Sequence, residues 1–206
     1  MADLNWINLV PSSYRTAFQD RVISISNELG INPNWLMQVM YAESRVNPQA
    51  KNIQEGRLIA AGLIQWTKAS GYAPDFMLTK SGMEQLEYVR KYFLPYKGKM
   101  KSYYDVYAVV FFPALVGKPD DWVLKTDTLS SAIIGRQNPA IDINKNGTIT
   151  VKEFKQYVDK TSNGISFTYI MDYAKDHPKA SIGVILVAGG LLIYYIYFAT
   201  KIVKQQ

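Results

Sequence analysis

The feature that most constrains this chain is an uncharged apolar stretch near its C-terminal end. The twenty residues from Ala180 to Ala199 include no Asp, Glu, Lys or Arg, and lysines flank the stretch on both sides. A helix rises about 1.5 Å per residue, so it would span about 30 Å, one hydrocarbon thickness. We predict a transmembrane helix over residues 180–200, followed by a short basic tail, 201–206. The competing interpretation is a buried core helix, which would seldom be apolar on all faces.

The opening residues lack the basic start and unbroken apolar core of a secretory signal. We therefore expect the chain to be anchored by its tail, with residues 161–179 as a linker after a soluble body. The 206 residues include no cysteine and one histidine, His177, and carry a net charge of +6. This composition excludes a disulfide framework and Cys-ligated zinc, and the charge favours polyanionic surroundings.

Hydrophobic periodicity predicts a mainly α body. A first helix is expected from Tyr14 to Leu29, with Ser12 or Ser13 as its cap and Gly30 as its stop. No segment shows sustained period-two alternation, so any strands should be short. Further helices are predicted from Asn32-Pro33 to near Asn47-Pro48, over 82–93, over 104–112 and within 121–134, and residues 71–81 and 97–102 are predicted to be loops.

The second predicted helix carries a carboxylate on its apolar stripe. Leu36, Val39, Met40 and Glu43 occupy positions i, i+3, i+4 and i+7. A carboxyl held in an apolar cleft can have its pKa raised to about 6–7, which suits a general acid. The alternative is that Glu43 lies at the helix end, where the stripe meets water.

The residues around Glu43 resemble the lytic transglycosylases of the lysozyme-like superfamily. Residues 41–50 read YAESRVNPQA and residues 61–65 read AGLIQ. The family pattern has Glu-Ser at a helix end, an Asn-Pro-x-Ala turn and a downstream Gly-Leu-Met-Gln, with Ile64 here in the Met position. The Phe-Phe-Pro at residues 111–113 is similar to transglycosylase-type domains of bacteriophage proteins. The resemblance implies a lysozyme-like (goose-type) domain over residues 1–137.

The resemblance also implies a reaction. Glu43 would cleave the MurNAc-β-1,4-GlcNAc bond of peptidoglycan, first as acid and then as base, closing a 1,6-anhydro ring. The substrate-binding residues would be Ser44, Gln65 and Tyr107. The alternatives are, in the same order, a helix-terminal hydroxyl, a turn amide and a packed core tyrosine. Tyr107 lies where the family has a Tyr-Asn pair, but Ala108 follows it. A hydrolase would need a second carboxylate, for which Glu55, Asp75 and Asp105 are candidates.

A basic and aromatic stretch lies between Leu86 and Tyr104. Five Lys or Arg residues alternate there with six aromatic residues, and no acid follows Glu87. Such a stretch could bind single-stranded nucleic acid, attract peptidoglycan carboxylates beside a sugar cleft, or form a solvated face. We expect no nucleic-acid partner.

Residues 142–153 read DINKNGTITVKE and fit the twelve-residue EF-hand loop. Only two of the predicted ligands are charged, so we expect a structural Ca²⁺ of modest affinity held by residues 138–160. Asn138-Pro139 leaves little room for a regular incoming helix, and the alternative is an Asx-rich turn without an ion. The predicted ligands are Asp142, Asn144, Asn146, the Thr148 carbonyl, Thr150 and Glu153.

Together with the resemblance, these features predict a membrane-anchored lytic transglycosylase that opens peptidoglycan during phage entry or release. Its expected location is a phage virion membrane or the bacterial cell envelope, with peptidoglycan and the lipid membrane as partners. The alternative is a non-catalytic virion structural or peptidoglycan-binding membrane protein that keeps the fold. The sequence leaves open the membrane orientation, the oligomeric state and the choice between transglycosylase and hydrolase.

Overall fold

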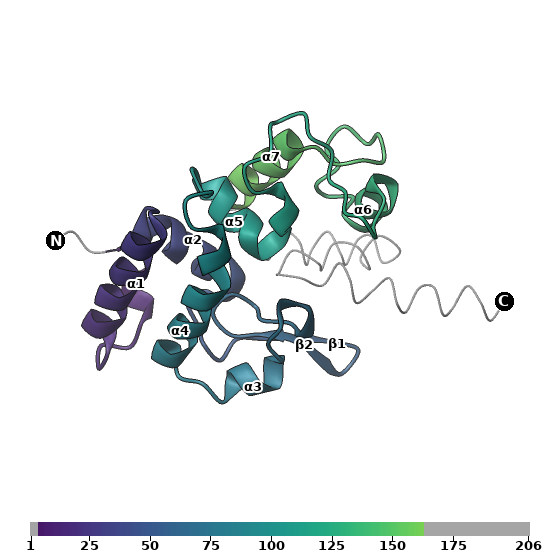
Figure 1. Ribbon diagram of the computed structural model, residues 1–206. Coiled ribbons are helices and arrows are strands. Elements are labelled where there is room, and N and C mark those ends of the chain that lie inside the picture. Colours follow the sequence, from purple (N-terminus) through teal and green to yellow (C-terminus); the bar gives the residue numbers. More distant parts are fainter. Residues whose placement is uncertain (1–3, 163–206) are drawn as a thin grey trace. The chain divides into compact units, whose positions relative to one another are not determined.

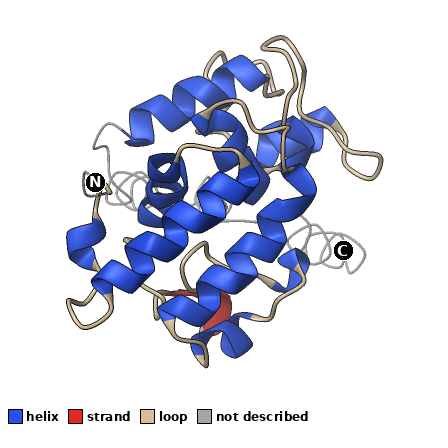
Figure 2. Cartoon of the chain, turned by 60° about the vertical axis from the view of Figure 1, so that its left-hand side comes forward, coloured by secondary structure: helices blue, strands red, loops and turns tan. Residues whose placement is uncertain are grey.

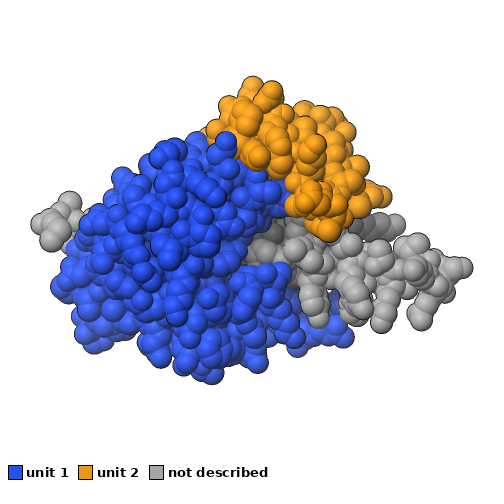
Figure 3. All heavy atoms as spheres, viewed as in Figure 1, with its two compact units in different colours: residues 1–117, 188–190 blue, residues 118–187, 191–206 orange. Residues whose placement is uncertain are grey.

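The computed structural model describes residues 4–162, and this part of the chain is mainly helical, as predicted (Figures 1 and 2). It contains seven α-helices, four short 3-10 helices and one two-stranded hairpin. These residues form two compact units, 4–117 and 118–162, which Figure 3 colours separately.

The predicted transmembrane helix over residues 180–200, the linker before it and the basic tail after it lie outside the described residues. Among the helices between residues 4 and 162, none combines the length and the apolar character that crossing a bilayer requires.

Four helices build the core of the first unit. Helix α1 (Arg15–Leu29) packs on α2 (Pro33–Ser44) and on α4 (Gly82–Phe93), and α2 also packs on α5 (Tyr103–Phe111). Each helix has an apolar stripe at three- and four-residue spacing, which places its members on one face. Buried members of these stripes include Phe18, Val22, Ile25, Leu29, Leu36, Met40, Leu86, Val89, Phe93, Val106 and Val109.

Local capping explains where these helices begin. The Asn34 amide donates to the Asn32 side chain at 2.9 Å, which confirms the predicted start of α2. Ser81 forms a reciprocal capping box with Glu84 at the start of α4. The predicted serine cap of the first helix is wrong, because α1 begins after Tyr14 and no side chain caps it.

Two ion pairs join α1 to α4. Arg21 binds both carboxylate oxygens of Glu87 at 2.5 and 2.7 Å, and Arg90 binds both oxygens of Glu28 at 2.5 Å. The hydrogen bonds from the guanidinium groups lower the pKa of both glutamates. Because the four side chains are partly exposed, water and salt screen both pairs, and their contribution to stability is small.

A small hairpin follows α2. Strand β1 (Lys51–Gln54) pairs antiparallel with β2 (Arg57–Ala61), through a turn whose central residues Glu55 and Gly56 have φ angles of 49° and 73°. Two positive φ angles are typical of a type I′ turn, the geometry that suits a tight hairpin. The sequence expectation of short strands is confirmed.

Other sequence expectations need correction. Helix α2 ends at Ser44, before the predicted stop near Asn47, because Arg45 and Val46 adopt left-handed φ angles of 57° and 59°. The predicted loop over 71–81 contains α3 (Pro74–Leu78), which packs on β2. A five-residue helix begun by proline is too short to show periodicity.

The second unit surrounds the EF-hand-like segment. Helix α6 (Ser131–Gln137) precedes the segment and is shorter than the helix predicted within 121–134, and α7 (Val151–Ser162) follows. The Leu124 amide donates to the Ile149 carbonyl at 2.8 Å, so the end of the segment pairs with the chain before α6. The buried apolar residues of the second unit include Leu124, Leu129, Ile134, Ile141, Ile149, Val151, Phe154 and Val158.

The contact between Gly135 and Gly147 yields a test of this packing. A Cβ atom at position 135 would overlap the Gly147 carbonyl, so no side chain fits there. We expect Gly135→Ala to lower the free energy of unfolding by about 3 kcal/mol. Ala132→Ser, on the exposed side of the same helix, should change it by about 0.5 kcal/mol or less. Equal urea midpoints for the two variants would contradict the close packing.

Candidate functional site

Glu43 lies in the last turn of α2 with its carboxyl withdrawn from water. Leu36, Val39 and Met40 on the same stripe are fully buried. Glu43 as a whole is partly exposed, yet both carboxyl oxygens are buried. Within residues 4–162, neither oxygen accepts a hydrogen bond of ordinary geometry. The stripe therefore carries the carboxyl into an apolar setting, as its spacing predicts.

This setting changes the acidity of the group. Burial raises the pKa of Glu43 well above its ordinary value, because the charged form loses its hydration. The Tyr107 side chain acts in the opposite direction and lowers that pKa to a smaller extent. A carboxyl with a raised pKa keeps its proton at higher pH, which a general acid requires.

Tyr107 lies on α5, which packs against α2. The residue is buried, and its ring centroid is 6.0 Å from that of Tyr103. Tyr107 interacts with the Glu43 carboxyl and lowers its pKa, although no hydrogen bond of ordinary geometry joins the two side chains. The structure thus brings together two of the residues that the sequence selected, from segments 64 positions apart.

The Ser44 side chain contacts backbone carbonyl groups at the end of α2. Its hydroxyl lies 2.9 Å from the Met40 carbonyl and 2.9 Å from the Leu63 carbonyl. The hydroxyl bonds within its own helix or to the chain after β2, and it does not bond to Glu43. Ser44 therefore joins the end of α2 to the turn that contains Gln65.

That turn spans Gly62 to Gln65 and is closed by its neighbours. Trp66 and Ala61 exchange two backbone hydrogen bonds, at 2.7 and 3.1 Å. Gln65 is buried, has a φ angle of 54°, and donates its side-chain N–H to the Gly62 carbonyl at 3.3 Å. A left-handed conformation at a residue other than glycine is costly and needs support from its surroundings.

Gln85 supplies much of this support, and sequence reasoning gave it no role. Its side-chain oxygen accepts from the Leu63 amide at 2.8 Å, and its side-chain nitrogen donates to the carbonyls of Pro48 and Met77 at 2.8 and 3.0 Å. A Cβ at Gly62 would overlap that oxygen, so the glycine allows the close approach. The only available signal was a polar residue among the apolar positions of α4, the same signal that marks Glu43.

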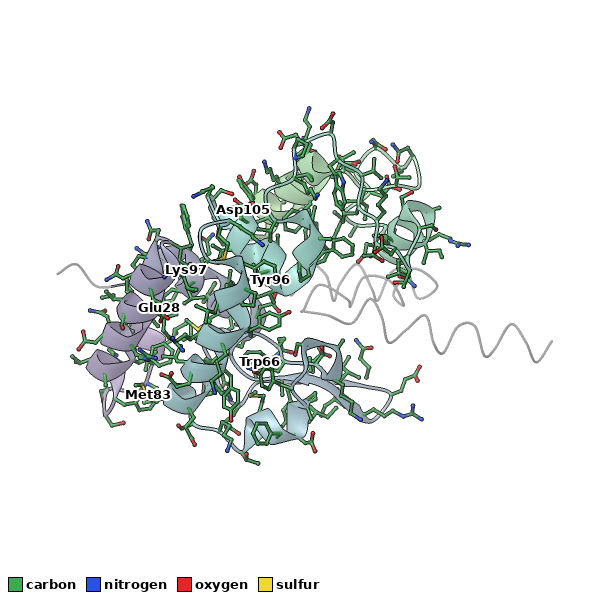
Figure 4. The ribbon with its side chains drawn as sticks, viewed as in Figure 1. Glu28, Trp66, Met83, Tyr96, Lys97 and Asp105 are labelled. Atoms are coloured by element: carbon green, nitrogen blue, oxygen red, sulfur yellow. The ribbon has the colours of Figure 1, made fainter. Side chains whose placement is uncertain are left out.

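Trp66 is a second residue that the sequence analysis missed. It follows Gln65, is 1% exposed, and its ring lies edge-on to Tyr72 and Tyr92, at centroid distances of 5.1 and 5.5 Å (Figure 4 labels Trp66). Its indole N–H is buried without a partner among the described residues. Burial raises the pKa of Tyr92 to about 12, so that phenol stays neutral.

The three candidates for a second carboxylate lie in other settings. Asp105, labelled in Figure 4, accepts hydrogen bonds from the amides of Lys101, Ser102 and Gly117, so it fixes the start of α5. Glu55 is exposed in the hairpin turn, and Asp75 is exposed in the first turn of α3. None of them shares the burial of Glu43.

The EF-hand-like segment folds around its own oxygen atoms. The Asp142 carboxylate accepts from the amides of Asn146 and Gly147, at 3.1 and 2.8 Å. The Glu153 carboxylate accepts from the amides of Asn144 and Thr150, at 3.2 and 2.9 Å. The first and last predicted ligands thus both fold back onto the loop.

The remaining predicted ligands lie between these two. The Asn144 side-chain oxygen accepts from the Asn146 amide, and the Asn146 oxygen accepts from the amide and hydroxyl of Thr148. The Thr150 hydroxyl donates to Glu153. Gly147 has a φ angle of 83°, which provides the sharp turn that an EF-hand loop has at this position.

The charge of this loop bears on whether it could hold a cation. Asp142 and Glu153 are both buried, and neither forms an ion pair with a Lys or Arg of residues 4–162. Both carboxylates are satisfied instead by hydrogen bonds from amides of the loop, and those to Glu153 lower its pKa. Among residues 4–162, no three His, Cys, Asp or Glu side chains lie close enough together to hold a metal ion. In this loop only Asp142 and Glu153 are of these types, and the other predicted ligands are amide, hydroxyl and carbonyl oxygens.

The burial of Glu43 predicts a pH-dependent cost in stability. Near pH 4 the carboxyl is largely protonated in the folded and unfolded chains, and the cost is small. As the pH rises above the ordinary glutamate value, the unfolded chain loses this proton first, so folding becomes less favourable. We expect Glu43→Gln to raise the free energy of unfolding at neutral pH by about 1–3 kcal/mol, and by less near pH 4.

Urea unfolding of the two proteins at several pH values measures this difference. Glu55→Gln, at an exposed position of the hairpin turn, serves as the control and should show no such trend. A Glu43→Gln variant with the same or lower stability than the parent at neutral pH would contradict the buried, unpartnered carboxyl.

Comparison with protein-family models, with curated protein sequences and with solved structures finds no match for this chain. The functional argument therefore starts from the geometry of Glu43, Tyr107 and the turn that ends in Gln65. The calcium-loop pattern of residues 142–153 is an independent second feature.

Proposed function

We propose that this protein is a membrane-anchored lytic transglycosylase of the lysozyme-like superfamily that opens peptidoglycan during bacteriophage entry or release. The observation that carries the proposal is the buried carboxyl of Glu43 in the last turn of α2, which has a raised pKa and no ordinary hydrogen bond. The motif resemblance around this residue supports the substrate, a MurNAc-β-1,4-GlcNAc bond. The uncharged stretch at 180–199 supports attachment to a phage virion membrane or to the bacterial cell envelope.

The proposed chemistry uses one carboxyl twice. Protonated Glu43 gives its proton to the glycosidic oxygen as the C1–O bond of MurNAc breaks. The resulting carboxylate takes the proton of the C6 hydroxyl while that oxygen bonds to C1, which forms the 1,6-anhydro ring and restores the acid. The settings of Glu55, Asp75 and Asp105 favour this scheme over hydrolysis with a second carboxylate.

Other predicted site residues have supporting roles in this proposal. Tyr107 tunes and orients the Glu43 carboxyl, consistent with its effect on the pKa. Ser44 holds the Gly62–Gln65 turn beside the end of α2, and the side-chain oxygen of Gln65 is a proposed acceptor for a sugar hydroxyl or N-acetyl group.

Digestion of purified sacculi tests the activity directly. The full chain in mild detergent should release muropeptides with anhydro ends, identified by mass spectrometry. Glu43→Gln should lower the rate by about 10³-fold, because it removes the acid and base group. Glu55→Gln should keep the parental rate, since it alters an exposed turn. Reducing ends would indicate a hydrolase, and intact sacculi would favour the non-catalytic wall-binding or virion structural alternative.

The pH profile distinguishes a tuning role for Tyr107 from a purely structural one. Tyr107 lowers the pKa of Glu43, so Tyr107→Phe should raise that pKa further. A general acid acts while it is protonated, so the activity of Tyr107→Phe should persist to higher pH on the basic limb. A profile that keeps its basic limb in place while the rate falls would remove Tyr107 from the proposed site.

We also propose that residues 142–153 bind a structural Ca²⁺. Asp142, Asn144, Asn146, Thr150 and Glu153 offer side-chain oxygens and Thr148 its carbonyl, as in an EF-hand loop. One such loop beside the short helix α6 favours a clip that stabilises the second unit over a sensor that opens a groove. With Asn in two of the ligand positions, the affinity should be modest.

Thermal unfolding with and without Ca²⁺ tests this site. At a free concentration of about 100 times the dissociation constant, binding should stabilise the fold by about 2.7 kcal/mol. Glu153→Gln should abolish this gain, whereas Asp127→Asn, exposed before α6, should retain it. An unfolding temperature that is the same in chelator and in millimolar Ca²⁺ would contradict the calcium site.

A further inference from the structure

The chain after α4 combines exposed cationic and apolar side chains. Helix α4 continues into the 3-10 helix η3 (Leu94–Tyr96), and a tight turn follows, in which the Lys99 amide donates to the Tyr96 carbonyl at 2.9 Å. No acidic residue occurs between Tyr88 and Tyr104. We call the exposed residues here the α4 tip; they are Lys91, Leu94, Pro95, Lys97, Lys99 and Lys101.

The positive charge of the α4 tip is only partly offset by acidic neighbours. Within residues 4–162, none of its four lysines forms an ion pair at 4.0 Å or less. Glu28 attracts Lys97 and Glu87 attracts Lys91 at longer range, but arginines already bind both oxygens of each glutamate. Figure 4 labels Glu28, Tyr96 and Lys97 in this region. The charge of the tip is therefore free to act on a partner.

The apolar part of the α4 tip distinguishes it from a solvated basic loop. Leu94 is 38% exposed, and Pro95 next to it is also exposed. Nucleic acid or wall carboxylates would satisfy the lysines but would leave these two side chains without a role. A lipid surface satisfies both, because apolar groups enter the headgroup region while lysines reach the phosphates.

An aromatic surface continues from the tip along α4 towards α3. The Lys91 ammonium lies 5.6 Å from the centre of the Tyr88 ring, and the Tyr88 and Phe76 rings are 5.8 Å apart. Phe76 is 41% exposed, and the Lys80 ammonium lies 4.7 Å above its ring. Aromatic rings beside lysines are typical of the membrane–water interface.

We propose that the α4 tip docks onto the surface of a bilayer that contains anionic lipid. The proposal rests on membrane attachment as part of the proposed function, and it adds which face of the first unit meets the membrane. The uncharged stretch at 180–199 belongs to the same chain and would keep the tip at high local concentration near the lipid.

The absence of cysteine from the sequence allows a site-specific test. Leu94→Cys in the full chain is labelled with an environment-sensitive fluorophore and reconstituted into phosphatidylcholine vesicles with or without phosphatidylglycerol. We expect a severalfold rise in emission on the anionic vesicles. The rise should shrink as ionic strength increases from about 0.1 to 1 M, because the Debye length falls from about 10 to about 3 Å.

Two variants serve as controls. Leu9→Cys carries the same label at a residue that is 46% exposed, at the end of the 3-10 helix η1 (Ile7–Leu9), and its emission should not change. Replacing the four tip lysines by Gln should abolish the response at Leu94. Since all four are exposed, this variant should keep the parental circular dichroism spectrum.

Flotation of the same vesicles separates this inference from attachment by the tail. Protein that floats with anionic vesicles while the Leu94 probe stays silent would overturn docking of the tip and leave the tail anchor standing. An equal response on neutral vesicles would overturn the requirement for anionic lipid. A response to single-stranded oligonucleotide without vesicles would assign the tip to nucleic acid and overturn the lipid proposal.

Discussion

The arrangement of the chain around Glu43 depends on the hydrogen bonds of the Gln85 carboxamide. With one oxygen and one nitrogen it joins the turn after β2, the Pro48 carbonyl after α2, and the Met77 carbonyl in α3. Removing a buried group of this kind leaves its partners without hydrogen bonds, at a cost of about 1–3 kcal/mol for each. These segments do not belong to one continuous helix or sheet. The Gln85 side chain and the Ser44 hydroxyl therefore supply the hydrogen bonds that hold them together.

Glu43 has the opposite energetic character. Its oxygens are buried without an ordinary hydrogen bond, so the fold is less stable for containing it, while the raised pKa keeps the carboxyl protonated at higher pH, as the proposed general acid would require. Unsatisfied groups of this kind tend to occur at functional sites, where stability is exchanged for reactivity. By contrast, Asp105 is fully engaged in capping α5, and Glu87 and Glu28 are bound by arginines.

Much of this arrangement follows from local rules. The Asn32-Pro33 start of α2, the bounds of α4 and the place of Glu43 on its stripe all depend on residues within one or two helical turns. Helix α3 and the late start of α6 escaped prediction because short helices leave no periodic trace. The role of Gln85 and the approach of Tyr107 to Glu43 depend on contacts between segments distant in sequence, and a single sequence provides no pattern for such contacts.

The end of α2 has one further electrical consequence. A helix carries partial negative charge at its C-terminus, where the last carbonyl groups lack intrahelical partners. Glu43 lies in that final turn, immediately before Ser44, so the backbone itself repels an ionised side chain at this position. The left-handed residues Arg45 and Val46 turn the chain away from the helix axis. Their backbone N–H groups donate only to the carbonyls of Tyr41 and Met40. The same carboxyl in the first turn of a helix would meet the reverse field and release its proton more readily.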